Sequence, residues 1–175
     1  MKIFLIGFMG SGKTVTGRLL ADKLTYNFYD TDEMLEKQFL CSIYDCFDKY
    51  GEDTFRKAEH KLLLQLIASN ENAVIACGGG LACHQNNMGI MNRKGITVYL
   101  KYSQNILYKR IENTKHIRPL LTKQSDLKVF VSNLLSERSK YYEKAKYVIE
   151  AGENETVDEI VKKILKRMKG NFDGE

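Results

Sequence analysis

Short apolar runs alternate along the chain with longer segments in which apolar residues recur at helical spacing. The pattern predicts strands at residues 2–6, 26–30, 73–77, 96–100 and 147–150. After the first run, Val15, Leu19, Leu20 and Leu24 follow the spacing of one helical face. Strands that alternate with helices favour βαβ units. The pattern therefore predicts an α/β fold, a largely parallel sheet with helices on its faces.

The length of 175 residues fits a single domain that buries its own core. Hydrophobic residues make up 43% of the chain and charged residues 28%, which is typical of a soluble globular protein. A strand at the N-terminus leaves no room for a signal peptide, and no apolar run approaches the length of a membrane span. We therefore expect a cytoplasmic protein that has no membrane partner. We also expect a monomer.

Cysteines and charges argue against several kinds of site. The four cysteines, at positions 41, 46, 77 and 83, form no C-x-x-C pair and have no histidine at zinc-ligand spacing. Neither a zinc site nor a disulfide framework is therefore predicted. The net charge of +5 is mild, and the basic cluster at 162–169 lies opposite an apolar stripe. A solvated helix face is favoured there over nucleic-acid binding, and small anionic ligands suit the charge better.

The sequence GFMGSGKT, residues 7–14, stands between the first predicted strand and the first predicted helix. A strand, Gly-x-x-x-x-Gly-Lys-Thr and a helix in this order form the signature of a phosphate-binding P-loop. Its glycines allow backbone N–H groups to turn inward and bind phosphate oxygens together with the positive end of the helix. Lys13 would reach the β- and γ-phosphates of a nucleotide, and the Thr14 hydroxyl would be a ligand of Mg²⁺.

Asp30 and Asp32 stand at the end of the second predicted strand, at the edge where doubly wound sheets bind ligands. Two carboxylates one residue apart can diverge, so one can meet Mg²⁺ while the other faces a second substrate. The alternative for Asp32 is a helix N-cap, because a helical stretch begins near Glu33.

Two arginines share helical faces with apolar residues. Arg56 falls in register with Glu59 and the leucines that follow, and Arg138 continues an apolar stripe. A buried guanidinium needs an anionic partner. A structural carboxylate would serve, but two inward arginines favour a carboxylate that arrives with a substrate. The glycines at 78–80, after the third strand, add an edge without side chains where a ligand can press against the backbone.

The segment between residues 113 and 123 has no periodic pattern. It is polar and contains Arg118 and the single proline, Pro119. This composition predicts a mobile loop. Nearer the C-terminus, Thr156 followed by Glu159 predicts a capping box at the start of the last helix.

Six features occur together in this chain: GFMGSGKT at 7–14, DTD at 30–32, a stretch at 42–59 that ends in FRKAE, CGGG at 77–80, RPLL at 118–121 and the spacing from Arg138 to Tyr142. In this order and at these separations they resemble the shikimate kinase family. The resemblance extends from Lys2 to about Met168. Each motif alone is weak, and the specificity lies in the combination.

The resemblance implies a P-loop three-layer α/β/α fold with a five-stranded parallel sheet. It implies one kinase domain over residues 1–175, with a substrate-binding helical region at about 32–62 and a mobile lid at about 112–124. The implied reaction transfers the γ-phosphate of ATP to the 3-hydroxyl of shikimate, in aromatic amino-acid biosynthesis, with Mg²⁺ as cofactor. Implied nucleotide contacts are Gly10, Ser11, Gly12, Lys13, Thr14, Arg110 and Arg118.

Roles for single residues follow from the same resemblance. Thr14 and Asp30 would hold Mg²⁺, and Arg110 matches the position that stacks on adenine. The implied catalytic residues are Lys13 on the phosphates, Asp32 on the shikimate hydroxyls and Arg118 of the lid. Implied shikimate contacts are Asp32, Arg56, Gly78, Gly79, Gly80 and Arg138, with the two arginines clamping the carboxylate.

Two other kinds of protein share part of this pattern. Another small-metabolite P-loop kinase, such as a gluconate or nucleoside monophosphate kinase, would not be expected to combine DTD, FRKAE and GGG with an inward Arg138. A non-catalytic ATP-binding regulatory domain would not need Lys13, Asp30, Asp32 and Arg118 together. The loop at 150–157 departs from the family, which often has Thr and Pro there, and this departure bears on nucleotide affinity and base selectivity.

Overall fold

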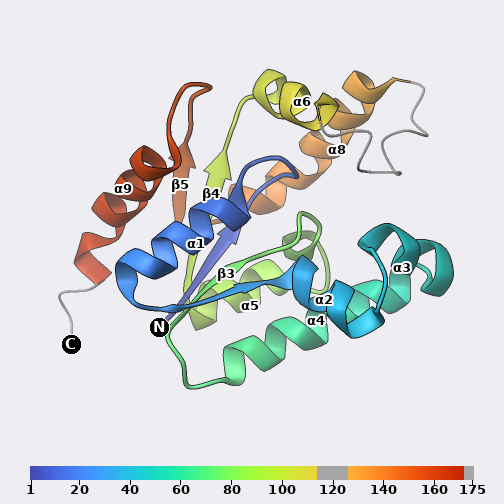
Figure 1. Ribbon diagram of the computed structural model, residues 1–175, viewed down its shortest axis with the longest axis horizontal. Coiled ribbons are helices and arrows are strands. Elements are labelled where there is room, and N and C mark those ends of the chain that lie inside the picture. Colours follow the sequence, from blue (N-terminus) through green and yellow to red (C-terminus); the bar gives the residue numbers. More distant parts are fainter. Residues whose placement is uncertain (114–125, 172–175) are drawn as a thin grey trace.

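The computed structural model describes residues 1–113 and 126–171 and has a five-stranded parallel sheet at its centre (Figure 1). The strands lie in the order β2-β3-β1-β4-β5. The buried residues of β1, β3 and β4 reflect a sheet covered on both faces. The strands are β1 (Lys2–Ile6), β2 (Asn27–Asp30), β3 (Ala73–Ala76), β4 (Ile96–Lys101) and β5 (Tyr147–Glu150).

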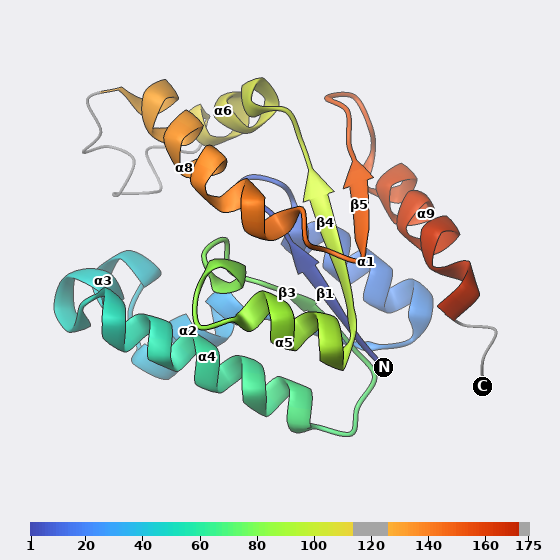
Figure 2. The same ribbon diagram turned by 180° about the vertical axis from the view of Figure 1, so that it is seen from behind.

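Helices cover both faces of this sheet and give the fold three layers. On one face α1 packs against α9 and the central strands. On the other face lie α4, α5 and α8, seen from their own side in Figure 2. The helices are α1 (Lys13–Leu24), α2 (Thr31–Phe39), α3 (Ile43–Tyr50), α4 (Glu52–Ala68), η1 (Leu81–Cys83), α5 (Asn87–Lys94), α6 (Gln104–Glu112), α8 (Leu127–Tyr142), α9 (Val157–Met168) and η3 (Lys169–Asn171).

All five predicted strands are confirmed, and each predicted boundary lies within one residue of the observed one. The predicted capping box is also confirmed. The Thr156 hydroxyl accepts from the Glu159 N–H at 3.3 Å, and the Glu159 carboxylate accepts from the Thr156 N–H at 2.8 Å. Short apolar runs and a local cap depend on neighbouring residues only, so they are visible in the sequence.

The apolar stripe predicted for α1 is wrong in one position, because Val15 is 56% exposed. Small residues face the sheet beside Leu20 instead, among them Gly17. A Cβ atom on Gly17 would lie 2.6 Å from Cε2 of Phe28. The close approach of α1 to the sheet therefore selects small side chains at the contact, which a search for apolar spacing does not detect.

Helices α2, α3 and the first part of α4 form a lobe to one side of the sheet, next to the edge strand β2 (Figure 1). Aromatic rings hold the lobe together. The rings of Phe47 and Phe55 have their centroids 4.5 Å apart, and Phe39 packs on Tyr50 at 5.3 Å. The lobe corresponds to the helical region predicted to bind substrate.

The predicted lid, at about 112–124, falls almost wholly outside the described residues, and so does Arg118. Helix α6 ends at Glu112, and α8 begins at Leu127. Of the helices that the structure describes, none combines the length and the apolar character required to cross a membrane.

Candidate active site

The loop between β1 and α1 has the backbone geometry of a P-loop. Gly7, Gly10 and Gly12 have positive φ angles of 147°, 80° and 79°, which residues with a side chain rarely adopt. Gly12 is the N-cap of α1, so the first N–H groups of the helix and its positive end point into the loop. Residues 10–14 therefore form a cradle suited to an anion.

Lys13, the first residue of α1, lies against this loop. Its Nζ donates to the carbonyl oxygens of Gly7 and Phe8, both at 2.9 Å. The Ser11 N–H closes the loop by donating to the Phe8 carbonyl oxygen at 3.2 Å. The ammonium group is thus held where it can contact a phosphate bound by the loop.

Arg110 of α6 contacts the same loop. Its Nη1 donates to the Gly10 carbonyl oxygen at 3.2 Å. Its guanidinium lies over the ring of Tyr102, with Cζ 4.2 Å from the ring centroid. Tyr102 is buried, so its ring is a fixed support. Stacking on this ring sets the plane of the guanidinium beside the P-loop.

Asp30 joins the end of β2 to the P-loop helix. Its Oδ2 accepts from the Thr14 hydroxyl at 2.6 Å. Its Oδ1 accepts from the N–H groups of Asp32 and Glu33 at 3.0 and 3.3 Å. Asp30 is therefore the N-cap of α2, and the alternative that Asp32 is the cap is wrong, because the helix begins at Thr31. Asp32 stands in the first helical turn.

Thr14 and Asp30 fit the Mg²⁺ ion that the sequence predicts. Their hydroxyl and carboxylate oxygens meet beside the phosphate loop. Mg²⁺ prefers oxygen ligands and takes few of them from the protein, while water and phosphates complete the shell. Within the described part of the chain, no three His, Cys, Asp or Glu side chains gather as a metal site. A Mg²⁺ ion here would take its remaining ligands from water and from the phosphates of a nucleotide.

Gly78, directly after β3, faces two carboxylates. A Cβ atom on Gly78 would collide with Oδ1 of Asp32 and would lie 3.0 Å from Oε1 of Glu59. The Gly78 N–H donates to the Thr31 hydroxyl at 2.8 Å, which ties this edge to the start of α2. The missing side chain is therefore what allows Asp32 and Glu59 to approach the end of β3.

The next two glycines face the two arginines. A Cβ atom on Gly79 would lie 3.3 Å from Nη1 of Arg138, and one on Gly80 would lie 2.5 Å from Nη1 of Arg56. We call residues 78–80 the glycine edge. The structure thus brings the predicted substrate residues Asp32, Arg56 and Arg138 together at one end of β3, although they come from three different helices.

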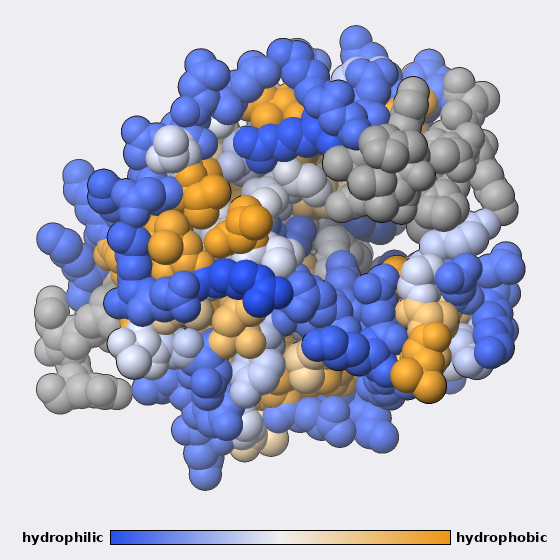
Figure 3. Space-filling model, viewed as in Figure 1, coloured by the Kyte–Doolittle hydropathy of each residue, from blue (hydrophilic) through white to orange (hydrophobic). Residues whose placement is uncertain are grey.

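The glycine edge and the P-loop are adjacent, because β1 and β3 pair in the sheet. A Cβ atom on Gly79 would lie 3.6 Å from the backbone nitrogen of Met9 in the P-loop. In Figure 3 this face of the molecule is hollowed between the α6–α8 side and the α2–α3 side. A ligand on the glycine edge and a phosphate in the P-loop would therefore be neighbours.

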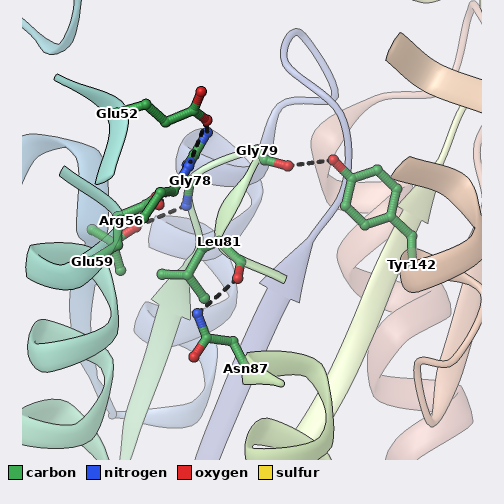
Figure 4. A network of polar contacts seen from close by, with 9 residues as sticks. Glu52, Arg56, Glu59, Gly78, Gly79, Leu81, Asn87 and Tyr142 are labelled. Atoms are coloured by element: carbon green, nitrogen blue, oxygen red, sulfur yellow. Dashed lines mark hydrogen bonds and ion pairs between the residues drawn. The ribbon is translucent and has the colours of Figure 1, made fainter. Parts of the chain in front are cut away.

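Two carboxylates of its own helix hold Arg56 (Figure 4). Its Nη1 lies 2.5 Å from Oε2 of Glu59, and its Nη2 lies 3.0 Å from Oε1 of Glu52. Its guanidinium also lies over the ring of Phe47, 5.3 Å from the centroid. The sequence allowed a structural carboxylate as the partner of Arg56, and two are present. They leave room for a substrate carboxylate, because a guanidinium has five N–H donors.

Arg138 and Tyr142 lie one turn apart on α8, and both contact Gly79. The Tyr142 hydroxyl donates to the Gly79 carbonyl oxygen (Figure 4). Tyr142 is fully buried and packs on Tyr99, with ring centroids 5.2 Å apart. It fixes α8 against the glycine edge. In residues 1–113 and 126–171, no carboxylate forms an ion pair with Arg138.

Glu59 is only 2% exposed, contacts Arg56 and lies close to Asp32. Burial raises the pKa of Glu59 to about 7, although Arg56 opposes the rise, and the Asp32 carboxylate adds to it. Glu59 therefore exchanges its proton near neutral pH. Its charge state sets how much negative charge faces the glycine edge beside Asp32.

A family model described as Shikimate kinase matches residues 9–169. The chain belongs to the shikimate kinase family. A shikimate kinase of Flavobacterium johnsoniae is 40% identical over 167 residues, which cover 94% of this chain and 96% of that protein. A shikimate kinase of Aquifex aeolicus is 40% identical over 171 residues, which cover 98% of each.

Solved structures of the shikimate kinase family share the whole fold. The crystal structure of a shikimate kinase from Bacteroides thetaiotaomicron has a TM-score of 0.90 at 34% identity, covering 97% of this chain and 98% of that one. A shikimate kinase from Acinetobacter baumannii, in complex with shikimate, has a TM-score of 0.89 at 33% identity, covering 97% and 93%. The predicted P-loop fold and the resemblance to shikimate kinases are both confirmed.

A gluconokinase from Sinorhizobium meliloti has a TM-score of 0.57 at 18% identity, covering 99% of this chain and 97% of that one. This likeness shows the fold alone. For the gluconate kinase alternative, the comparison therefore supports a shared fold and no more.

Three residues of the site had no role in the sequence analysis. Tyr142 had only its spacing from Arg138 as a signal. Tyr102 had none, because its contact with Arg110 depends on where α6 lies relative to the end of β4. Glu59 had a signal, since it stands three positions after Arg56, but that spacing is equally typical of an ordinary helical ion pair.

We predict that Glu59→Gln removes a pH dependence of stability. The raised pKa means that folded Glu59 keeps its proton after the unfolded chain has lost it. Between the ordinary pKa of 4.5 and about 7, the stability contributed by this group therefore falls as the pH rises. Chemical denaturation across this range should show the wild-type midpoint falling relative to that of Glu59→Gln. The exposed Glu137→Gln is the control, and identical pH profiles for wild type and Glu59→Gln would contradict the assignment.

Proposed function

We propose that this protein catalyses transfer of the γ-phosphoryl group of ATP to the 3-hydroxyl of shikimate, giving shikimate 3-phosphate and ADP. Membership of the shikimate kinase family supports this reaction. One observation of the structure carries it: a P-loop adjoins a glycine edge that Asp32, Arg56 and Arg138 face. We also propose that the protein is a cytoplasmic monomer of one kinase domain.

Charge complementarity supports the proposed position of shikimate. Its carboxylate would lie between the guanidinium groups of Arg56 and Arg138, with the backbone of the glycine edge beside it. Asp32, on the other side of this edge, would accept a hydrogen bond from the hydroxyl that attacks. Because the P-loop adjoins Gly79, this hydroxyl would point toward the γ-phosphate.

Phosphoryl transfer depends mainly on positioning and on neutralising the charge of the phosphate oxygens. Lys13 and the N–H groups of the P-loop would supply fixed positive groups. Thr14 and, through water, Asp30 would hold Mg²⁺, which would supply positive charge against the phosphate oxygens. Arg118 of RPLL, outside the described residues, stays the predicted lid arginine.

The adenine base would stack on Arg110, which Tyr102 supports from below. The sequence resemblance implies the same role for Arg110. The hydrogen bond from Arg110 to the Gly10 carbonyl oxygen links the proposed base site to the phosphate loop. Because the Tyr102 ring and the Gly10 carbonyl oxygen both hold the Arg110 guanidinium in place, it would offer a flat, preorganised surface to the base.

The reaction itself is tested by a coupled assay of ADP release with Mg-ATP and, in parallel, shikimate, gluconate and AMP. Turnover is expected with shikimate alone. AMP has no carboxylate for the two arginines, and gluconate has no ring to hold its hydroxyls at a fixed distance from its carboxylate, beside Asp32. Turnover with gluconate or AMP and none with shikimate would refute the proposal. ATP binding by calorimetry without turnover on any acceptor would favour a regulatory ATP-binding domain.

We predict that Arg138→Ala raises the KM for shikimate roughly 10- to 100-fold and leaves the KM for ATP nearly unchanged. A charge-assisted contact to a carboxylate contributes about 1.5–3 kcal/mol, and Arg138 would make this contact with shikimate only. Steady-state kinetics with each substrate varied in turn gives both constants. The control is Arg167→Ala on the exposed face of α9. An equal loss of ATP affinity would contradict the proposed clamp.

We predict that Tyr102→Leu raises the KM for ATP roughly 2- to 30-fold, while Tyr102→Phe stays close to wild type. A cation–π contact contributes about 0.5–2 kcal/mol and needs the ring, which phenylalanine keeps and leucine lacks. The KM for shikimate should not change in either variant. If Phe and Leu were equally harmful, or if both KM values rose together, Tyr102 would have only a general structural role.

A further inference from the structure

Two cysteines meet at the junction of α2 and α3, outside the proposed active site. Cys41 lies just beyond the end of α2, and Cys46 lies in the first half of α3. Their Sγ atoms are 2.8 Å apart. Cys46 is completely buried, whereas Cys41 is partly exposed. Both are free thiols in this structure.

The backbone of the junction is fixed by bonds that do not involve the thiols. The Glu36 carboxylate accepts from the Ile43 N–H at 3.0 Å, and the Glu36 carbonyl oxygen accepts from the Cys41 N–H at 3.3 Å. The Ser42 hydroxyl caps α3 by accepting from the Asp45 N–H at 3.2 Å. The fold therefore holds the two sulfurs side by side, so a bond between them would form with little further loss of conformational entropy.

We propose that Cys41 and Cys46 are a modification site that closes to an intramolecular disulfide when the protein meets a small-molecule disulfide such as oxidised glutathione. The sulfurs need to approach by only about 0.8 Å to reach the S–S bond length of about 2.0 Å. This inference concerns the thiols alone and does not depend on the kinase reaction.

The accessibility of the two thiols sets the order of the steps. Cys41 lines a surface cavity of about 440 Å³ together with Glu33, Glu36, Lys37 and Ser42. A small disulfide can reach this sulfur. The buried Cys46 cannot be reached directly, and burial, with the Cys41 thiol adding to it, raises the pKa of Cys46 to about 12. Cys41 is therefore the thiol that reacts first, since a thiolate is the attacking species.

The exchange balances without another reagent. The Cys41 thiolate attacks one sulfur of oxidised glutathione, the glutathione S–S bond breaks, and one glutathione leaves as a thiolate. The Cys46 sulfur, after its proton passes to solvent, attacks the Cys41 sulfur of the mixed disulfide and displaces the second glutathione. Two protein thiols are oxidised, and one molecule of oxidised glutathione is reduced to two of the thiol.

The other two cysteines are not arranged for this reaction. Cys77 is buried, and its sulfur contacts the Ile75 carbonyl oxygen and the Met91 sulfur. Burial raises the pKa of the Cys83 thiol to about 11. No second cysteine sulfur is recorded beside either of them in the described residues. Oxidation should therefore be confined to the α2–α3 junction.

The disulfide would act on a segment that supports Arg56. Phe47 follows Cys46, and its ring packs on Phe55 and under the Arg56 guanidinium. A bond from Cys46 to the end of α2 would hold α3, and with it the Phe47 ring, in the position already observed. We therefore expect oxidation to stabilise this lobe rather than to distort it.

The test is mass spectrometry of the full-length protein after incubation of its reduced form with oxidised glutathione. Cleavage after lysine places both cysteines in one peptide, residues 38–49. We expect this peptide to become two hydrogen atoms lighter and resistant to alkylation, and to return to its original mass with dithiothreitol. The oxidised protein should also have a higher Tm than the reduced one.

Two variants separate the steps. Cys46→Ser should leave a lasting glutathione adduct on Cys41, because nothing displaces it, and Cys41→Ser should leave Cys46 unmodified. Their Tm values, measured reduced, show that each variant is folded. The proposal is overturned if wild type keeps glutathione on Cys41, if it stays unmodified, or if oxidation lowers its Tm. None of these outcomes depends on whether the protein phosphorylates shikimate.

Discussion

The absence of side chains at the carboxyl end of β3 is the constraint on which the site depends. At each of the three glycines, the volume that a Cβ atom would fill is approached by a functional group: the Asp32 carboxylate, the Arg138 guanidinium or the Arg56 guanidinium. These groups come from α2, α8 and α4, which approach the strand from different directions. A single added methyl group would push one of them outward, so the geometry of the charged groups follows from the backbone that they surround.

The two arginines at this edge differ in how many protein carboxylates they contact. Arg56 already has the carboxylates of Glu52 and Glu59, and this fixes the direction of its guanidinium. Arg138 is held by its helix, which Tyr142 anchors to Gly79, and no ion pair to it occurs in the described residues. One arginine is thus oriented by protein anions, while the other has no carboxylate ion pair in the described residues, as the proposed contact with the shikimate carboxylate requires. Burial raises the pKa of Glu59 to about 7 and the Arg56 guanidinium opposes this rise, so the two effects compete at this edge.

The sequence was sufficient wherever a feature depends on neighbouring residues. Apolar runs gave the strands, glycine spacing gave the P-loop, and Thr156 with Glu159 gave a capping box. It was insufficient wherever a contact depends on how elements pack. The sequence left open whether Asp32 caps α2. The cap is Asp30, because the helix begins at Thr31, and the Asp30 carboxylate also accepts from the Thr14 hydroxyl.

Contacts between distant segments, or within irregular ones, could not be predicted from the sequence either. Tyr102 and Arg110 are eight positions apart with a helix start between them, and the turn that unites Cys41 and Cys46 is set by the Glu36 carboxylate. The residues alone predict that Arg56 and Arg138 meet a substrate carboxylate and that an aspartate at the end of the second strand faces a substrate. That all three groups meet at one edge was implied only by the resemblance. The physical reason for it, three close approaches to one glycine edge, required the structure.

A crystal structure of the protein with shikimate bound is the most direct test of this account. We predict that the shikimate carboxylate lies between Arg56 and Arg138, against Gly79 and Gly80, with a ring hydroxyl within hydrogen-bond distance of the Asp32 carboxylate. A shikimate molecule bound away from the glycine edge, or one whose carboxylate contacts neither arginine, would contradict it.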